Sequence, residues 1–295
     1  ADAGNFAAAL DALVNELAAT LDDETLLVLD EYHLVDARPE LRAIIERLLA
    51  VQPLRLHVAL STRYAPTMPG LDTARLRGEL IEFGPSDLAL TLAELRNLAA
   101  RASLPPPADA EAIVTSTAGW PLAIQATLGV ADWQAALGLC GEDRPIGPLD
   151  AYLSEQVLAD LPADLYHFVL RSAALRWLDP EVAPLLSTVA EVETLFAEVH
   201  RRHLFLAQCP DGHTGFQPIF HAFLVRRARA EMSDWSDLHL HLSAHYQSRG
   251  DDEGVLHHLA AANDPRAIEA LVVAAKTIFA AGEPDSGLCP VCHQP

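Results

Sequence analysis

The spacing of apolar residues predicts the first elements of the chain. Residues 25–29 form a continuous apolar run, which predicts a strand buried on both faces, as in a parallel sheet under helices. Over residues 39–51 the apolar positions recur at helical spacing, with a proline suited to the first turn. A second apolar run covers residues 54–61. A strand, a helix and a strand of this length predict a βαβ unit with parallel strands and a right-handed crossover.

Charged residues follow both predicted strands. Asp30 and Glu31 come directly after the first strand, and ligands bind at the carboxyl ends of parallel strands. This pattern matches a Walker B element, in which the aspartate holds Mg²⁺ and the glutamate orients the attacking water. The alternative is an ordinary strand that ends in a solvated acidic turn. Arg63 follows the second strand, where it could contact a γ-phosphate or form a salt bridge to either carboxylate.

The rest of the first half is mainly helical. A short strand is predicted over residues 80–83, as the last of the sheet. Thr91 and Glu94 have the spacing of a capping box and predict the start of a helix. Trp120 and Pro121 stand at the start of a later helix, with the proline at its first position. On these residues alone, the alternative is a joint between two helices with a buried tryptophan.

The second half has the pattern of a winged helix. Four short helices are predicted between residues 151 and 201, and strands over 204–207 and 214–216 flank an Asp-Gly turn. This fold suggests DNA binding but does not decide it. The region has a local excess of positive charge, which suits contact with DNA or with an acidic neighbouring part of the protein, and the family resemblance given below implies the acidic neighbour. The arginines are Arg201, Arg202, Arg226, Arg227 and Arg229.

Composition narrows the classes of function. The net charge of −21 argues against broad non-specific binding of nucleic acid. The four cysteines are too few and too scattered for a secreted disulfide framework, and no apolar run is long enough to span a bilayer. We therefore expect a cytoplasmic protein without membrane contacts. The single lysine, Lys276, excludes a phosphate loop of the form GxxxxGK[ST] from these 295 residues. Since the chain begins with alanine, we expect it to be part of a longer protein.

The C-terminal tail contains a pattern of its own. Cys289, Cys292 and His293 match the CxxCH pattern of haem attachment, and they could also form half of a zinc site. Neither a signal peptide nor a second Cys/His pair nearby supports these readings. A tail without regular structure is the alternative.

Three stretches together resemble MalT-like regulators, the large LuxR-type transcription activators of the STAND class of ATPases. They are residues 27–35, 56–63 and 75–80, and the resemblance extends to about residue 280. It implies a mainly α fold with an α/β part, as a fragment without the Walker A loop and without the C-terminal DNA-binding domain. The implied parts are the C-terminal half of a P-loop NTPase parallel sheet (1–85), a helical lid (86–140), a linker (141–149), a winged helix (150–232), the start of a TPR-like helical arm (233–280) and a tail (281–295).

The resemblance also implies roles for residues. Asp30 and Glu31 correspond to the Walker B pair, with Asp30 as the metal ligand, and Arg63 corresponds to the sensor arginine. Trp120 and Pro121 belong to the GxP motif, whose proline packs on the adenine.

One position departs from the family pattern. The family has a histidine after the wing that reaches the β-phosphate, and this sequence has Gln217 there. Glutamine can donate a hydrogen bond but supplies no charge, so we expect weak retention of ADP. His221 lies one helical turn further on and is a conceivable substitute.

These assignments predict a nucleotide-dependent switch module, using ATP or ADP with Mg²⁺, of a signal-responsive transcription activator. We expect slow ATPase activity in the full-length protein and none in this chain. The implied partners are nucleotide and a second copy on activation, with DNA bound only through a domain absent here. A degenerate STAND scaffold that acts as a protein-interaction module without nucleotide is the alternative, and a haem or zinc protein is a third hypothesis.

Overall fold

The computed structural model divides the chain into two compact units. The first contains Ala1–Glu82 with Arg201–His203, and the second contains Phe83–His200 with Leu204–Pro295. Each unit is described by itself. The residues that the structure describes are 3–36, 38–66, 68–105, 107–139, 147–187, 192–202, 204–208 and 212–272, without the side chains of 3–7.

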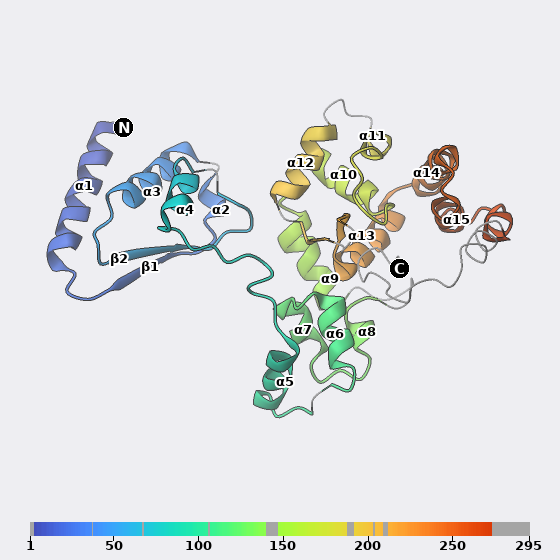
Figure 1. Cartoon of the computed structure of the whole chain (residues 1–295), viewed down its shortest axis with the longest axis horizontal. Coiled ribbons are helices and arrows are strands. Elements are labelled where there is room, and N and C mark those ends of the chain that lie inside the picture. Colours follow the sequence, from blue (N-terminus) through green and yellow to red (C-terminus); the bar gives the residue numbers. More distant parts are fainter. Residues whose placement is uncertain are drawn as a thin grey trace. The chain divides into compact units, whose positions relative to one another are not determined.

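The first unit is built on the predicted βαβ arrangement. Strands β1 (Thr25–Leu29) and β2 (Leu56–Leu60) are parallel, with Leu29 opposite Leu60 at their carboxyl ends. Helix α3 (Pro39–Val51) begins at the proline and connects the strands, after the short helix α2 (His33–Asp36). The parallel pairing predicted from the apolar pattern is confirmed (Figure 1).

The sheet is covered on one face only among the described residues. Helix α1 (Ala3–Thr20) and α3 pack against that face, where Val14, Leu48 and Leu56 form the buried core. On the other face, Leu26 is 61% exposed and Val28 is 58% exposed. The expectation that β1 is buried on both faces was therefore wrong for the described part of the chain. Successive side chains of a strand point to opposite faces, and here helices lie against one of them.

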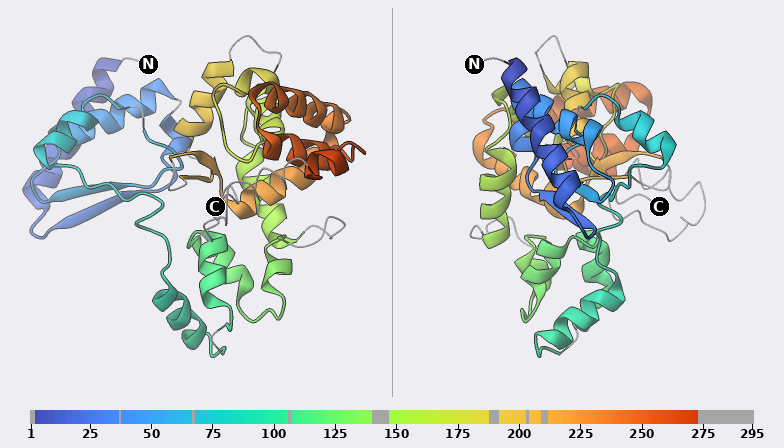
Figure 2. Two further views of the ribbon diagram at one scale, coloured as in Figure 1. Left: turned by 45° about the vertical axis from the view of Figure 1, so that its right-hand side comes forward. Right: turned by 90° about the vertical axis from the view of Figure 1, so that its left-hand side faces the viewer.

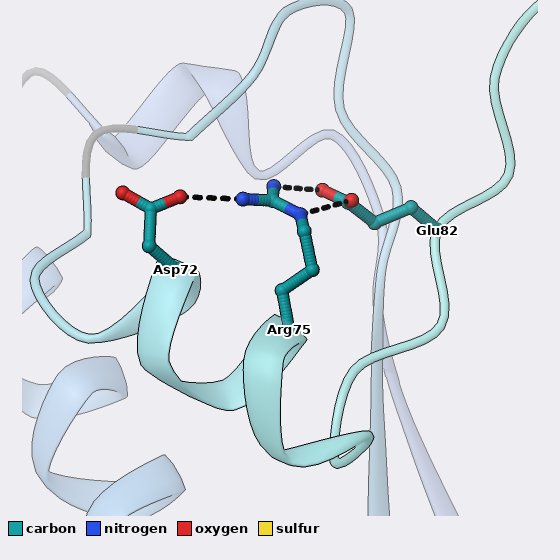
Figure 3. Close-up of polar contacts among 3 residues, drawn as sticks. All are labelled: Asp72, Arg75 and Glu82. Atoms are coloured by element: carbon teal, nitrogen blue, oxygen red, sulfur yellow. Dashed lines mark hydrogen bonds and ion pairs between the residues drawn. The ribbon is translucent and has the colours of Figure 1, made fainter.

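The strand predicted over residues 80–83 does not form. This segment follows α4 (Leu71–Arg77) in extended irregular structure, and its Ile81 side chain is exposed. Figure 3 shows how it is fixed: Arg75 lies between Asp72 and Glu82, and two of its nitrogens donate to the Glu82 carboxylate at 2.7 and 2.8 Å. Because Arg75 donates to this carboxylate, the pKa of Glu82 lies below its usual value. The ion pair holds the segment without any strand pairing.

The second unit opens with a cluster of short helices. The predicted capping box is confirmed: the Thr91 amide donates to Glu94 at 2.9 Å, and the Glu94 amide donates to the Thr91 hydroxyl at 3.3 Å. A small core of Leu95, Ile113 and Ile124 joins the first three helices. The helices, which gather together in both views of Figure 2, are α5 (Leu92–Arg101), α6 (Ala110–Thr117), α7 (Pro121–Thr127) and α8 (Trp133–Ala136).

The winged helix follows and holds the largest core. Strands β3 and β4 pair antiparallel, with Leu206 opposite Phe216, so the predicted hairpin is confirmed. The Cys-Pro-Asp residues of its turn (209–211) and residues 141–146 of the predicted linker (141–149) lie outside the described residues. Phe168, Phe220 and Leu224 are fully buried in the core. The elements are α9 (Pro148–Leu153), its continuation η1 (Ser154–Leu158), α10 (Ala163–Ser172), α11 (Ala183–Leu186), α12 (Val192–Arg201), β3 (Leu206–Gln208), β4 (Thr214–Phe216) and α13 (Pro218–Glu231).

Two further helices follow the winged helix. Helices α14 (Trp235–Arg249) and α15 (Asp252–Ala261) lie side by side (Figure 1) and are joined by a tight turn at Gly250. The Asp251 side chain caps α15 by accepting from the Gly254 amide at 2.8 Å. A longer TPR-like arm stays a prediction, and the Cys/His tail lies outside the described residues. Across the described residues, no helix is both long and apolar enough to cross a bilayer.

Candidate functional site

The carboxyl edge of the first unit's sheet brings Asp30 and Ser61 together. The parallel register puts the ends of β1 and β2 side by side. There the Ser61 hydroxyl donates to Asp30 Oδ1, and the Ser61 amide donates to the Leu29 carbonyl at 3.0 Å. Ser61 was not singled out by the sequence, although its place two residues before Arg63 was a usable signal. The sequence-predicted Asp30 is thus held by a residue from the neighbouring strand.

The turn after Asp30 has an unusual backbone. Glu31 has a φ of 52°, a left-handed conformation that is uncommon outside glycine. Its amide donates to Asp30 Oδ1 at 2.9 Å, and the Tyr32 amide donates to the Ser61 carbonyl at 2.8 Å. These bonds over-determine the turn and compensate for its strain. The exposed Glu31 side chain therefore leaves the sheet at a fixed position.

The Asp30 carboxyl is held in its ionised form. The hydrogen bond from Ser61, and then the bond from the Glu31 amide, lower its pKa below the usual value. An exposed, ionised carboxylate suits Mg²⁺, which proteins bind through one or two carboxylates together with water and substrate phosphates. No group of three or more His, Cys, Asp or Glu side chains within the described residues could hold a metal. Asp30 could therefore supply only part of a coordination shell.

Buried aromatic and polar residues pack against this turn. Tyr32 is 1% exposed, and burial, followed by the effect of the nearby Asp36 carboxylate, raises its pKa to about 12. The Tyr64 hydroxyl donates to the His33 carbonyl at 3.2 Å, and the His33 and Tyr64 rings meet edge to face. Tyr64 follows β2, so the cluster ties the turn after β1 to the segment after β2. Sequence reasoning missed this support.

Arg63 lies on the same segment after β2. Because β1 and β2 are parallel, it leaves the sheet at the edge that carries Asp30 and Glu31, as predicted. Its side chain is exposed. The edge thus presents carboxylates from one strand and a guanidinium from the next.

The second group of predicted site residues lies in the second unit. Gly119 has a φ of 72°, and a Cβ there would come within 2.8 Å of the Ala89 Cβ, so glycine is required. The Trp120 ring packs edge-on against Phe205, with ring centroids 4.9 Å apart. Pro121 is exposed at the first position of α7. The tryptophan therefore anchors this turn, while the proline ring remains accessible.

Phe205 connects Gln217 to this turn. Gln217 is the residue before α13, and its backbone amide donates to the Phe205 carbonyl at 2.7 Å. Phe205 itself has a φ of 49°, and its ring also packs on Phe220 at 4.8 Å. The structure thus brings Trp120 and Gln217 together around one strained aromatic residue. His221, the conceivable substitute, places a ring nitrogen 2.9 Å from the Ala173 carbonyl oxygen.

Two arginines of the basic region have partners inside the second unit. Arg226 donates to Asp150 at 2.6 Å and to the Gly138 carbonyl at 2.5 Å. Arg227 pairs with Glu231. The acidic partners of Arg226 and Arg227 therefore come from the second unit itself.

Comparison with known proteins addresses the second unit most directly. Residues 154–236 match the family model described as the MalT winged helix domain, and they contain the elements from η1 to α13, including the hairpin of β3 and β4. The chain is MalT-like. It is 28% identical over 248 residues to the HTH-type transcriptional regulator MalT of Cronobacter sakazakii. It is 26% identical over 279 residues to the protein of the same name from Klebsiella pneumoniae.

The MalT-like chain is much shorter than these relatives. The alignments cover 81% and 90% of this chain but only 27% and 31% of the relatives' own lengths. The similarity therefore concerns less than a third of a MalT protein.

Proposed function

We propose that the MalT-like chain is the nucleotide-dependent switch part of a transcription regulator. The observation that carries the proposal is the carboxyl edge of the first unit, where Ser61 holds the ionised Asp30 carboxylate beside Glu31. The names of the relatives, which are transcriptional regulators, support the wider role. DNA binding by the whole protein would then belong to a domain outside these 295 residues.

Each residue of the edge has a distinct part in this proposal. Asp30 would hold Mg²⁺ through the carboxylate oxygen that Ser61 does not occupy. Glu31 would accept a proton from water, and Arg63 would contact the terminal phosphate. Mg²⁺ with ATP, when bound, supplies the phosphoanhydride that is hydrolysed. Pro121 would offer an apolar surface to the adenine, and Gln217 a neutral hydrogen bond to phosphate.

The residues present fit one part of a nucleotide site and lack another. Asp30 has the charge and exposure of a Mg²⁺ ligand. A triphosphate also needs a cradle of backbone amides and a lysine, and the only lysine of the sequence is Lys276. We therefore expect nucleotide binding only in a longer protein that supplies a phosphate loop.

The test measures ATP turnover and Mg²⁺-dependent nucleotide affinity, in this chain and in the protein extended by its natural upstream sequence. We expect no turnover by the chain alone and slow turnover by the extended protein. Glu31→Gln should remove turnover and spare binding, because the amide keeps the shape and cannot accept a proton. Asp30→Asn should weaken Mg²⁺-dependent binding of nucleotide. Arg63→Ala should weaken the binding of ATP more than the binding of ADP.

A matched control separates these effects from general damage. Glu16→Gln changes an exposed carboxylate on α1 in the same unit, and it should leave turnover and affinity unchanged. Turnover by the bare chain, or full turnover in Glu31→Gln, would reject the assignment.

The scaffold that works without nucleotide remains the second candidate. Gln217 favours it, because a neutral side chain at this position gives no charge-assisted bond to phosphate. An extended protein that folds but shows no affinity for ATP or ADP would support the scaffold. If the protein is a nucleotide-dependent switch, Gln217→His should slow the release of ADP. If it is a scaffold without nucleotide, the substitution should not change ADP release.

A further inference from the structure

Three histidines are packed between α14 and α15. His239 comes from α14, and His257 and His258 come from α15. Nδ1 of His239 lies 2.9 Å from Nδ1 of His258, and both side chains are only 2% exposed. The ring centroids of His257 and His258 are 4.9 Å apart. We call these three residues the histidine cluster.

The contact between the two Nδ1 atoms requires that at least one of the two rings is neutral. One Nδ1 must carry a hydrogen and the other must offer its lone pair. If both rings were protonated, two N–H groups would face each other at this distance, and two positive charges would meet in a buried site. Aromatic rings cover the pair further: Trp235 meets His239 edge-on, and Tyr246 stacks on His258 with centroids 5.1 Å apart. His239 Nε2 is also buried, with no hydrogen-bond partner among the described residues.

The charged surroundings do not compensate a proton on the cluster. Arg176 and Arg229, which are positive, oppose protonation. The nearby carboxylates have other partners, since Glu253 pairs with Arg176 and Asp251 caps α15. Burial is the largest effect, and it lowers the pKa of His239 to about 4, of His257 to about 3 and of His258 to about 2.

The titratable and charged groups around the cluster are Arg176 and Asp179 after α10, His221 and Arg229 on α13, Tyr246, His245 and Arg249 on α14, and Asp251, Asp252 and Glu253 at the start of α15.

The space beside the cluster is too small for a ligand. A cavity of about 10 Å³ touches His257, His258 and Tyr246. This volume holds one water molecule at most. The cluster is therefore a packing feature that can exchange protons with water rather than a binding pocket.

The two helices depend differently on the main core. Helix α14 contributes Trp235, Leu238 and Leu242 to the core of the winged helix, whereas from α15 only the partly buried Val255 packs against it. Separation of α15 would expose the histidines and leave most of that core intact.

We propose that the α14–α15 pair is an acid-sensitive joint, which opens when the histidine cluster takes up protons while the winged helix stays folded. The histidines are neutral when the helices are packed and regain their ordinary basicity when they separate. The closed pair is therefore fully stable above the ordinary histidine pKa of 6.5 and loses stability as the pH falls below it.

Hydrogen exchange of the chain, measured by mass spectrometry at pH 7.5 and 5.5 with a chelator present, tests the proposal. After correction for intrinsic exchange rates, the equilibrium constant for opening of α15 should be about tenfold larger at pH 5.5 than at pH 7.5 if one histidine takes up a proton. The increase should be larger if two or three histidines do. The amides of α10, in the core of the winged helix, should keep their protection at both pH values. His258→Asn keeps a polar atom near the Nδ1 position but cannot ionise, so opening should depend less on pH.

The control is His241→Asn, because His241 is exposed on the same helix α14. This variant should show the pH dependence of the unchanged chain. If His258→Asn loosens the packing, opening will rise at both pH values, and a smaller ratio between them still supports the proposal. Equal opening of α15 at both pH values in the unchanged chain would overturn it. Parallel loss of protection in α10, or an equal effect of His241→Asn, would also overturn it.

Discussion

At the scale of single residues, Ser61 determines how the acidic edge behaves. Its hydroxyl donates to Asp30 Oδ1, and its backbone bonds to both Leu29 and Tyr32. The side chain lowers the pKa of Asp30, while the backbone sets the position of the turn. A substitution that removes only the hydroxyl separates these two contributions.

We predict that Ser61→Ala raises the pKa of Asp30 toward its ordinary value of 3.8. The shift should be partial, because the Glu31 amide still donates to the carboxylate at 2.9 Å. The carboxyl ¹³C shift of Asp30, followed from pH 6 to pH 2, measures it. Ser248→Ala is the control, since the Ser248 hydroxyl donates to a backbone carbonyl in the other unit. An unchanged titration of Asp30 in Ser61→Ala would show that the serine does not lower its pKa.

At the scale of elements, Arg226 connects three parts of the second unit. It lies on α13, donates to Asp150 on α9 and donates to the carbonyl of Gly138 after α8. Gly138 has a φ of 72°, and a Cβ there would lie 2.6 Å from the guanidinium. The arginine therefore joins the helical cluster to the winged helix at a glycine whose positive φ other residues rarely adopt.

We predict that Arg226→Ala lowers the free energy of unfolding of the second unit by about 2 kcal/mol, because it leaves the partly buried Asp150 carboxylate without its guanidinium partner. The Arg226 and Asp150 side chains are 21% and 16% exposed. Urea unfolding followed by tryptophan fluorescence measures it. This signal is specific, since all four tryptophans of the chain lie in the second unit.

The exposed pair Arg249–Glu181 provides the matched control. Its side chains are 45% and 71% exposed, so Arg249→Ala should cost less than about 1 kcal/mol. Equal losses in the two variants would mean that the position of Arg226 between three elements carries no extra stability. Arg226→Gln, which keeps hydrogen-bond donors without the charge, should fall between Arg226→Ala and the unchanged chain.

At the scale of the whole molecule, charge and length limit what the chain does alone. The sequence carries a net charge of −21, and its alignments span less than a third of the relatives' length. A winged helix commonly suggests DNA binding, but fold alone does not establish it. Here Arg226 and Arg227 already pair with carboxylates of their own unit.

We predict that the isolated chain does not bind duplex DNA specifically. Its negative charge repels phosphates at low salt, where attraction to a basic protein would be strongest. A gel-shift assay at low salt, with a known DNA-binding winged helix as positive control, measures this. A sequence-specific shift that is lost in Arg227→Gln would contradict the prediction and assign the basic region to DNA.

The sequence by itself determined the features that depend on local pattern. Apolar spacing predicted the βαβ unit, Thr91 and Glu94 predicted a helix start, and an Asp-Gly turn predicted the hairpin of β3 and β4. Each rests on residues close in the chain, where backbone geometry limits the choices. The acidic residues at the carboxyl edge followed from the same logic, because parallel strands end at one edge of a sheet.

Only the tertiary structure decided which distant side chains meet and which faces are covered. The bond between Ser61 and Asp30, the pair Arg226–Asp150 and the contact of His239 with His258 join residues that are 31, 76 and 19 positions apart. Periodicity gives no information about such pairs, because it describes one element at a time. For the same reason β1 looked buried on both faces. An apolar run shows that a strand can be covered, and only the packing of helices against it decides which of its faces are.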